Sequence, residues 1–415
     1  MKAAILTIGD ELLYGQTVDT NSAFLGIQLA ELGYDPVCKE TVGDDIETIE
    51  ESIIRLSKRF KLVIATGGLG PTHDDVTKKA ICRAYKKNLV LYEDVLKFIN
   101  EKYRKRGIVM PAEVESQALL PQGCQVLENE WGTAPGILIN QEGSIFVSLP
   151  GVPFEMKNLF TGRLKPLLPQ MDGGKSITFK RLKTSGIRES DLYTKVKDLL
   201  APKEPVKLAF LPGYSGVDLR LTIKDKTRAE AIELIEEFEK KLREHAGKYI
   251  YAENDKTMPE IIAETLTSRR KTLSVAESCT GGLLSKLLTD IPGSSVYFER
   301  GAVTYSNEAK MEILGVPAEL IEKHGAVSQE VAEAMAKGIR ESSKTDFSLS
   351  ITGISGPSGG TDDKPVGTTW IALSSDNKIY SKKFVFVTDR ELNRSRAAMA
   401  ALNMLRLHLI GKLDS

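Results

Sequence analysis

The sequence predicts an α/β protein of three domains. Short apolar runs alternate with amphipathic helical patterns near both ends of the chain, as is typical of parallel sheets covered by helices. The region between them has fewer elements, with two strands in succession, which indicates a smaller α+β unit. A chain of 415 residues is also too long for a single core. We expect a parallel-sheet domain at 1–170, a small α+β domain at 171–252 and a second α/β domain at 257–415.

The composition is that of soluble globular material, with 41% hydrophobic and 27% charged residues. Lys and Arg together number 56, as do Asp and Glu, so the formal net charge is zero. The chain therefore has no overall positive charge that would attract nucleic acid or an anionic membrane. The four cysteines are far apart and form no metal-binding cluster, which favours reduced thiols in a cytoplasmic protein. No stretch has the roughly 18 consecutive apolar residues of a membrane span, and the first apolar run is too short for a signal peptide.

The first 85 residues have a βαβαβα pattern. Strands are expected at 3–8, 35–42 and 61–66, and helices at 21–32, 45–59 and 76–85. Open parallel sheets bind ligands beyond the carboxyl ends of their strands. The segments at those ends are acidic or glycine-rich: Gly9-Asp10-Glu11, Gly43-Asp44-Asp45 and the stretch from Thr66 to Thr77.

The third of these segments contains three glycines and two aspartates. Gly67, Gly68 and Gly70 would let backbone amides approach a phosphate or ribose closely. Asp74 and Asp75, with the aspartates at the neighbouring strand end, could hold a hard divalent cation through oxygen ligands. The alternative is that aspartates at these places cap helices, which is the expected role of at least one in each pair.

The chain continues to about 168 with a helix at 93–106, strands at 136–140 and 144–149, and a closing helix at 154–168. The middle domain has strands at 177–184, 206–211 and 217–223, and helices at 189–200 and 228–245. Gly213-Tyr214-Ser215-Gly216 has Gly-x-x-Gly spacing but joins two strands, so we expect a hairpin turn rather than a nucleic-acid clamp. Residues 253–256 are expected to form a polar linker.

The last domain again alternates helices and strands. Helices are expected at 258–269, 281–290, 307–314, 328–342 and 390–411, and strands at 272–276, 296–305, 346–352, 367–373 and 379–386. Its loop Thr352–Pro357 echoes Thr66–Pro71 after an apolar strand. The residues around the two loops follow different patterns, so we expect a similar loop in each domain rather than a duplicated domain.

The strand at 272–276 leads into Glu277-Ser278-Cys279-Thr280-Gly281-Gly282 and then a helix. This pattern places Ser278 and Cys279 at a strand end, beside the unpaired amides of Thr280, Gly281 and Gly282 at a helix start. It therefore indicates a nucleophile next to amides that stabilise an anion. The alternative is a helix cap followed by a glycine turn. Spacing leaves the choice between the serine and the cysteine open.

A serine nucleophile needs a group that removes its proton, and no histidine is placed to do so. Lys310 lies at the next helix start, where two parallel strands could bring it to Ser278. Its pKa would have to fall from about 10.4 through desolvation and the helix dipole. Donors for an oxyanion could come from the amides of Thr280–Gly282 or Gly353–Ser355. Arg394 could bind a substrate phosphate, or could belong to a solvated helix face.

These segments resemble the competence/damage-inducible protein A (CinA) family. The resemblance to its C-terminal domain rests on residues 276–282, 305–310, 324–328, 352–357 and 364–368. The segments 9–13, 19–22, 66–77 and 149–156 resemble its N-terminal domain, which is similar to molybdopterin-binding enzymes. The middle unit resembles the KH-like domain of the family, but its Gly-x-x-Gly joins two strands rather than two helices.

For the C-terminal domain, the resemblance implies a nicotinamide-nucleotide amidase that converts nicotinamide mononucleotide to nicotinate mononucleotide and ammonia without a cofactor. It implies Ser278 as the nucleophile, Lys310 as the base and Arg394 as a residue linked to substrate. The positions it implies for substrate or oxyanion contacts are Thr280, Gly281, Gly282, Tyr305, Thr352 and Gly353.

For the N-terminal domain, the resemblance implies a metal-dependent ADP-ribose pyrophosphatase that forms AMP and ribose 5-phosphate. It places a divalent metal such as Mg²⁺ at Asp44 and Asp75. The positions it implies for nucleotide binding are Asp10, Glu11, Asp19, Asn21, Thr66, Gly67, Gly68, Gly70 and Asp74.

The resemblance also implies a homodimer, and we expect no nucleic-acid partner. Two rival hypotheses are a regulatory protein tied to competence or DNA repair, and an N-terminal domain that binds or adenylylates molybdopterin.

Overall fold

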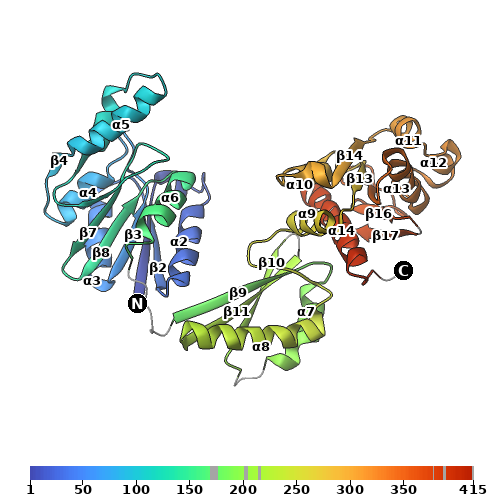
Figure 1. The fold of residues 1–415 in the computed structure, drawn as a ribbon, viewed down its shortest axis with the longest axis horizontal. Coiled ribbons are helices and arrows are strands. Elements are labelled where there is room, and N and C mark those ends of the chain that lie inside the picture. The colour runs from blue at the N-terminus through green and yellow to red at the C-terminus, as the bar shows by residue number, and fades with distance from the viewer. Residues whose placement is uncertain (169–175, 201–203, 214–215, 377, 387–388, 414–415) are drawn as a thin grey trace. The chain divides into compact units, whose positions relative to one another are not determined.

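The computed structural model describes residues 1–168, 176–200, 204–213, 216–376, 378–386 and 389–413 (Figure 1). The chain divides into two compact units, Met1–Thr178 with Ile223–Ile232, and Phe179–Thr222 with Glu233–Ser415. The first unit contains the N-terminal sheet. The second contains the C-terminal sheet and most of the middle domain.

The N-terminal sheet has six strands in the order β2-β1-β3-β8-β7-β6. The first four run parallel, as predicted for the start of the chain, and the last two add an antiparallel edge. In sheet order, the strands are β2 (Asp35–Val42), β1 (Lys2–Ile8), β3 (Leu62–Thr66), β8 (Ser144–Leu149), β7 (Gly136–Gln141) and β6 (Gln125–Leu127).

Helices cover both faces of this sheet because both faces are apolar. Along β1, Ala3 and Ile5 pack into one core, while Ala4 and Leu6 pack into the other. The first core is closed by α2 (Thr20–Glu31) and α6 (Pro153–Leu159), and the second by α3 (Ile46–Arg59) and α4 (Thr77–Ala84) (Figure 1).

Several short elements of this unit carry no periodic signal and were not predicted. They are α1 (Asp10–Leu13), β4 (Leu89–Leu91), β5 (Leu119–Pro121), β6 and a 3₁₀ helix at Ala112–Ala118. The predicted helix at 93–106 is α5 (Glu93–Lys105). The predicted closing helix ends as α6 at Leu159 and continues as a π-helical turn over Phe160–Leu164.

The middle domain has a four-stranded sheet of order β10-β11-β9-β12 and two helices. Gly213 pairs with Gly216 in the antiparallel β10–β11 ladder, which confirms the predicted hairpin; Tyr214 and Ser215 lie outside the described residues. The predicted linker at 253–256 is wrong at its first residue, because Glu253 belongs to β12 and pairs with β9. The elements are β9 (Ser176–Thr184), α7 (Glu189–Val196), β10 (Lys207–Gly213), β11 (Gly216–Lys226), α8 (Arg228–Ala246) and β12 (Ile250–Glu253).

The C-terminal sheet has the order β14-β13-β15-β16-β17, with β13 parallel to both of its neighbours and the last two strands antiparallel. Its strands are β13 (Leu273–Glu277), β14 (Phe298–Val303), β15 (Phe347–Gly353), β16 (Thr368–Ser374) and β17 (Ile379–Val385). One face packs against α9 (Met258–Arg269), α10 (Leu283–Thr289) and α14 (Arg390–Leu409). The other packs against α11 (Asn307–Leu314), α13 (Gln329–Ser343) and α12 (Ala318–His324), of which the last was not predicted.

Two further features concern membrane-spanning helices and the state of the cysteines. None of the helices in the described ranges is long and apolar enough to cross a membrane. Cys38, Cys82, Cys124 and Cys279 are all free thiols. The second finding agrees with the reduced state expected from their spacing.

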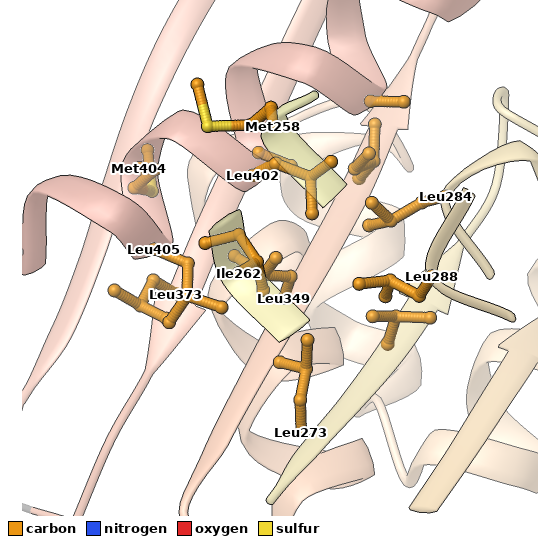
Figure 2. Close-up of a cluster of buried hydrophobic side chains, with 14 of the residues drawn as sticks. Met258, Ile262, Leu273, Leu284, Leu288, Leu349, Leu373, Leu402, Met404 and Leu405 are labelled. Carbon is orange, nitrogen blue, oxygen red and sulfur yellow. The ribbon is translucent and has the colours of Figure 1, made fainter. Parts of the chain in front are cut away.

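Leu349 lies in the main core of the C-terminal domain. Figure 2 shows its side chain among apolar residues of α9, α10 and α14, and it is fully buried. Because the surrounding helices can collapse only partly into the space, Leu349→Ala should lower the free energy of unfolding by about 2–5 kcal/mol. Denaturant unfolding followed by circular dichroism measures this loss. Ile313→Ala, on an exposed side chain of α11, should change it by less than about 0.5 kcal/mol; equal losses would contradict this account of the core.

Candidate active site

The turn after β13 is held by both neighbouring strands. The amide of Ser278 donates to the carbonyl of Ile351 in β15 at 2.9 Å, and the amide of Thr304, just after β14, donates to the carbonyl of Glu277 at 2.8 Å. Ser278 therefore lies at the carboxyl end of a central strand, where the sheet topology places ligand sites. The sequence pattern predicted this placement.

Two glycines let the chain turn from β13 into α10. Gly281 has φ 57° and Gly282 has φ 91°, backbone conformations that other residues adopt only with strain. The amide of Gly281 donates to the carbonyl of Ser278 at 3.0 Å and closes the turn. Ser278 is thereby fixed one short turn before the helix begins.

Lys310 lies one turn into α11 and is 1% exposed. Its Nζ lies 3.2 Å from Ser278 Oγ, 2.9 Å from the carbonyl oxygen of Thr304 and 3.3 Å from those of Tyr305 and Ser306. A neutral amine has two N–H donors and one lone pair. Two carbonyls can take the donors, which leaves the lone pair for the hydroxyl proton of Ser278. The structure thus brings the two side chains together.

The surroundings of Lys310 favour that neutral amine. Burial lowers the pKa of Lys310 from its ordinary value of 10.5, against smaller opposing contributions from Cys279 and Glu308. The amino-terminal end of α11 adds positive potential, which also disfavours an ammonium group. A lysine with a lowered pKa can serve as a base at moderate pH.

Cys279 points into a different environment from Ser278. Its side chain belongs to the apolar core cluster beneath α9 and α10, and the residue is 6% exposed. Burial raises the pKa of the Cys279 thiol, only partly opposed by a hydrogen bond with Ser355. The thiol therefore stays protonated near neutral pH and lacks the charge of a good nucleophile. The geometry favours the serine.

The structure corrects the expectation that the amides of Gly281 and Gly282 are unpaired. The first donates to the carbonyl of Ser278, and the second donates to Glu277 Oε2 at 3.1 Å. In the part of the chain that the structure describes, the amides of Cys279 and Thr280 donate to no other residue. These two adjacent amides are the donors left for an oxyanion beside Ser278.

The start of α14 faces the same turn. Arg394 donates from Nε and Nη2 to the carbonyl of Thr280 at 3.2 and 2.7 Å. Arg390 donates to the hydroxyl of Tyr305 at 3.0 Å and to the carbonyl of Gly356 at 2.8 Å. Both guanidinium groups therefore lie at the edge of the site, rather than on the solvated helix face that was the alternative for Arg394.

Thr352 and Gly353 end β15 beside Ser278, but their atoms are largely engaged. The hydroxyl of Thr352 donates to the carbonyl of Ala326 at 2.7 Å. A Cβ on Gly353 would lie 2.8 Å from the carbonyl oxygen of Thr368, so only glycine fits there. The amide of Ile354 in the same loop donates to that carbonyl at 2.8 Å. This loop shapes the site more than it offers donors.

The glycine loop of the N-terminal domain packs closely on neighbouring strand ends. Gly67 has φ 116°, and a Cβ there would lie 2.0 Å from the carbonyl oxygen of Ile8. At Gly68, with φ 64°, a Cβ would lie 2.2 Å from Thr77 Oγ1. Nearby, Asn21 Nδ2 donates to Thr66 Oγ1 at 3.2 Å. The side-chain oxygen of Asn21 is buried and has no hydrogen-bond partner in the described ranges.

Some aspartates of this domain cap helices, whereas others interact electrostatically with neighbouring carboxylates. Asp45 caps α3 by accepting from the amide of Thr48, as the capping alternative expected for one aspartate of its pair. Asp19 caps α2 in the same way, whereas α4 has no side-chain cap, so neither Asp74 nor Asp75 has the expected capping role. Asp44 Oδ2 instead accepts from the amide of Asp10 at 3.0 Å. Burial raises the pKa of Asp44, and the negative charges of Asp10, Glu11 and Asp75 raise it further. These four carboxylates share one electrostatic environment.

The Asp75 carboxylate also accepts hydrogen bonds within its own loop. Its carboxylate accepts from the amides of Gly70 and Thr72, both at 2.8 Å, and from the hydroxyl of Thr72 at 2.6 Å. Asp74 is exposed and pairs with His73 at 3.1 Å. Within the described residues, no group of three or more His, Cys, Asp or Glu side chains is arranged to hold a metal ion. The one feature that would favour a cation is the group of negative charges that raises the pKa of Asp44.

Comparison with known proteins covers nearly the whole chain. A "Putative competence-damage inducible protein" from Caldicellulosiruptor bescii is 42% identical over 410 residues, which is 99% of this chain and 100% of the relative. A "CinA-like protein" from Thermotoga maritima is 42% identical over 412 residues and 99% of each chain. The chain belongs to the CinA family.

Models of three domains match successive parts of the chain. The probable molybdopterin binding domain matches 4–170, the damage-inducible protein CinA KH domain 179–252 and the CinA C-terminal domain 255–409. Among solved structures, "the protein CinA with unknown function" from Thermoplasma acidophilum is 34% identical, covers 41% of this chain and 100% of its own, and has a TM-score of 0.38.

Two residues of the CinA C-terminal site escaped the sequence reasoning. Glu277 ends an otherwise apolar strand immediately before Ser278, and that unusual place for a carboxylate is the signal that could have drawn attention to it. No site role is predicted for Arg390, which with Arg396 formed the solvated helix face that was the alternative for Arg394. Its spacing of one helical turn from Arg394 puts both on one face of α14, which could have indicated a shared role.

Proposed function

We propose that the C-terminal domain hydrolyses the amide of nicotinamide mononucleotide by a serine–lysine mechanism. The observation that carries the proposal is the 3.2 Å contact between Lys310 Nζ and Ser278 Oγ. Lys310 takes the hydroxyl proton as Ser278 Oγ attacks the amide carbonyl carbon. The oxygen that becomes negative is held by the amides of Cys279 and Thr280.

Collapse of this intermediate breaks the carbon–nitrogen bond. Lys310 returns its proton to the leaving nitrogen, which departs as ammonia and leaves an ester on Ser278. Water then attacks the ester, with Lys310 as its base, and nicotinate mononucleotide is released. No step needs a metal or another cofactor.

The substrate class is supported by the family resemblance and by the charges at the edge of the site. Arg390 and Arg394 carry the only kind of side chain that binds phosphate with a planar fork of donors. Arg394 keeps a bond to the carbonyl of Thr280, so it links the substrate end of the site to the turn that carries Ser278. A phosphorylated amide fits this combination of cations and an acyl-transfer centre.

The test is to incubate the full chain with nicotinamide mononucleotide. We expect ammonia and nicotinate mononucleotide in equal amounts, with no loss of rate in a metal chelator. Chromatography and a coupled ammonia assay measure the two products. Release of nicotinamide in place of ammonia, or no turnover at all, would refute the proposal.

We propose that the N-terminal domain is a metal-dependent ADP-ribose pyrophosphatase. The carboxylates clustered around Asp44 support this function, together with the glycine loop at the same strand ends. Asp44 and Asp75 would hold Mg²⁺, which supplies charge stabilisation for a diphosphate. Of the surrounding groups, Asn21 has a buried oxygen without a partner in the described ranges, and Gly67 and Gly68 let the loop pack closely on Ile8 and Thr77.

Asp44→Asn should reduce Mg²⁺-dependent AMP formation from ADP-ribose by ~100-fold, because it removes one of the two proposed metal ligands. Chromatography of AMP across a Mg²⁺ titration measures the effect, and a chelator should stop the wild-type reaction. The matched control is Asp45→Asn on the next residue, which caps α3 and should keep most of the rate. Equal rates in Asp44→Asn and wild type would remove the metal role.

A further inference from the structure

A carboxylate is buried immediately before the proposed nucleophile. Glu277 is the last residue of β13 and is 0% exposed. A carboxylate taken out of water destabilises the fold unless its oxygens are hydrogen-bonded. The hydrogen-bond donors around Glu277 therefore show which part of the chain its carboxylate holds in place.

The donors all come from the turn and from the start of α10. Glu277 Oε2 accepts from the amides of Gly282 at 3.1 Å and Leu284 at 3.0 Å. Oε1 accepts from the amide of Ser285 at 2.8 Å and from its hydroxyl at 2.7 Å. These four bonds satisfy the carboxylate and, at the same time, pair three of the amides that a helix start leaves open.

The start of α10 is therefore already filled by an anion from the protein itself. Helix starts attract phosphate because their amides and dipole favour negative charge. Here the amides of Gly282, Leu284 and Ser285 are paired with Glu277 and are not open to a phosphate. The proposed phosphate contact therefore rests on the guanidinium groups of Arg394 and Arg390.

A cation also holds the same turn. Arg394 donates twice to the carbonyl of Thr280, while Glu277 accepts from the amide of Gly282 two residues on. With these groups fixed, the two amides that remain open are those of Cys279 and Thr280, beside Ser278 Oγ. The conformation of the oxyanion donors thus depends on Glu277 without any contact between Glu277 and the substrate.

We infer that Glu277 is a positioning residue: its buried carboxylate fixes the turn from Ser278 to Gly282, so that the serine hydroxyl and the amides of Cys279 and Thr280 are preorganised for acyl transfer. The inference rests on the proposed amidase function. It differs from a purely structural role, because loss of the carboxylate should affect the rate of the chemical step more than substrate binding.

The test compares Glu277→Gln with wild type. The glutamine amide replaces one acceptor oxygen by a donor, which faces amide N–H groups and forces the turn open. We expect kcat for ammonia release from nicotinamide mononucleotide to fall about 100-fold, with KM changed by less than about threefold. The matched control is Glu319→Gln, an exposed glutamate in the first turn of α12, for which both constants should be unchanged.

A second variant keeps the inference testable if Glu277→Gln fails to fold. Ser285→Ala removes only one of the four donors, so kcat should fall about fivefold with KM unchanged. Unchanged kcat in a folded Glu277→Gln, or in Ser285→Ala when the first variant is unfolded, would overturn the inference, as would a rise in KM at constant kcat. Failure of wild type to release ammonia would instead overturn the proposed function, so the two failures are distinguishable.

Discussion

Replacing Ser278 with alanine is expected to abolish ammonia release from nicotinamide mononucleotide. The loss in kcat should reach ~10⁴-fold, because the variant lacks the oxygen that attacks the amide and keeps only substrate binding and the oxyanion donors. Ser278 is buried, and within the described residues its hydroxyl has a side-chain hydrogen bond with Lys310 alone, so folding should be nearly unaffected. Steady-state ammonia release and the thermal unfolding midpoint measure the two effects separately.

Cys279→Ala is the matched control for this prediction. Its thiol lies in the apolar core and stays protonated, so its removal should cost some stability and leave most of the activity. Intact-protein mass spectrometry during turnover should show an acyl adduct in wild type and in Cys279→Ala, but none in Ser278→Ala. Equal losses of activity in both variants, or turnover by the serine variant, would refute the serine–lysine assignment.

The strand-to-helix pattern was sufficient to place the two proposed reaction centres at strand ends. Long apolar strands such as β1 and β2 and amphipathic helices such as α3 have strong periodic signals, and the structure agrees with them within one or two residues. The juxtaposition of Ser278 and Lys310 was predictable for the same reason. Parallel neighbours in a sheet bring the segments after their carboxyl ends together, and β13 and β14 are such neighbours.

What the sequence could not predict is how hydrogen bonds are shared within the turn. The amides of Thr280, Gly281 and Gly282 look equivalent in a sequence, yet only the first is open, because the partners of the others are set by three-dimensional packing. Short strands such as β4 and β12 were missed because three or four residues carry no measurable period.

The second large effect is expected at Lys310. Lys310→Met should lower kcat by ~10³-fold, because the serine hydroxyl then has no base to take its proton. Lys310→Arg should be equally inactive, since a guanidinium remains protonated at every accessible pH. The matched control is Lys286→Met, an exposed lysine of α10 paired only with Asp290, which should retain the wild-type rate. Activity in Lys310→Arg would show that a positive charge, rather than a base, is what the site requires.

The pH dependence of the wild-type rate tests the same role independently. Only the neutral amine of Lys310 accepts a proton, so kcat should be low well below the pKa of Lys310 and should rise as pH passes through it. Burial lowers that pKa from 10.5, which moves the rise to lower pH than an exposed lysine would give. The rising limb should disappear in Lys310→Met, whose residual rate lacks this titration. A limb that persists unchanged in the variant would assign it to another group and would leave Ser278 without the base that its 3.2 Å contact indicates.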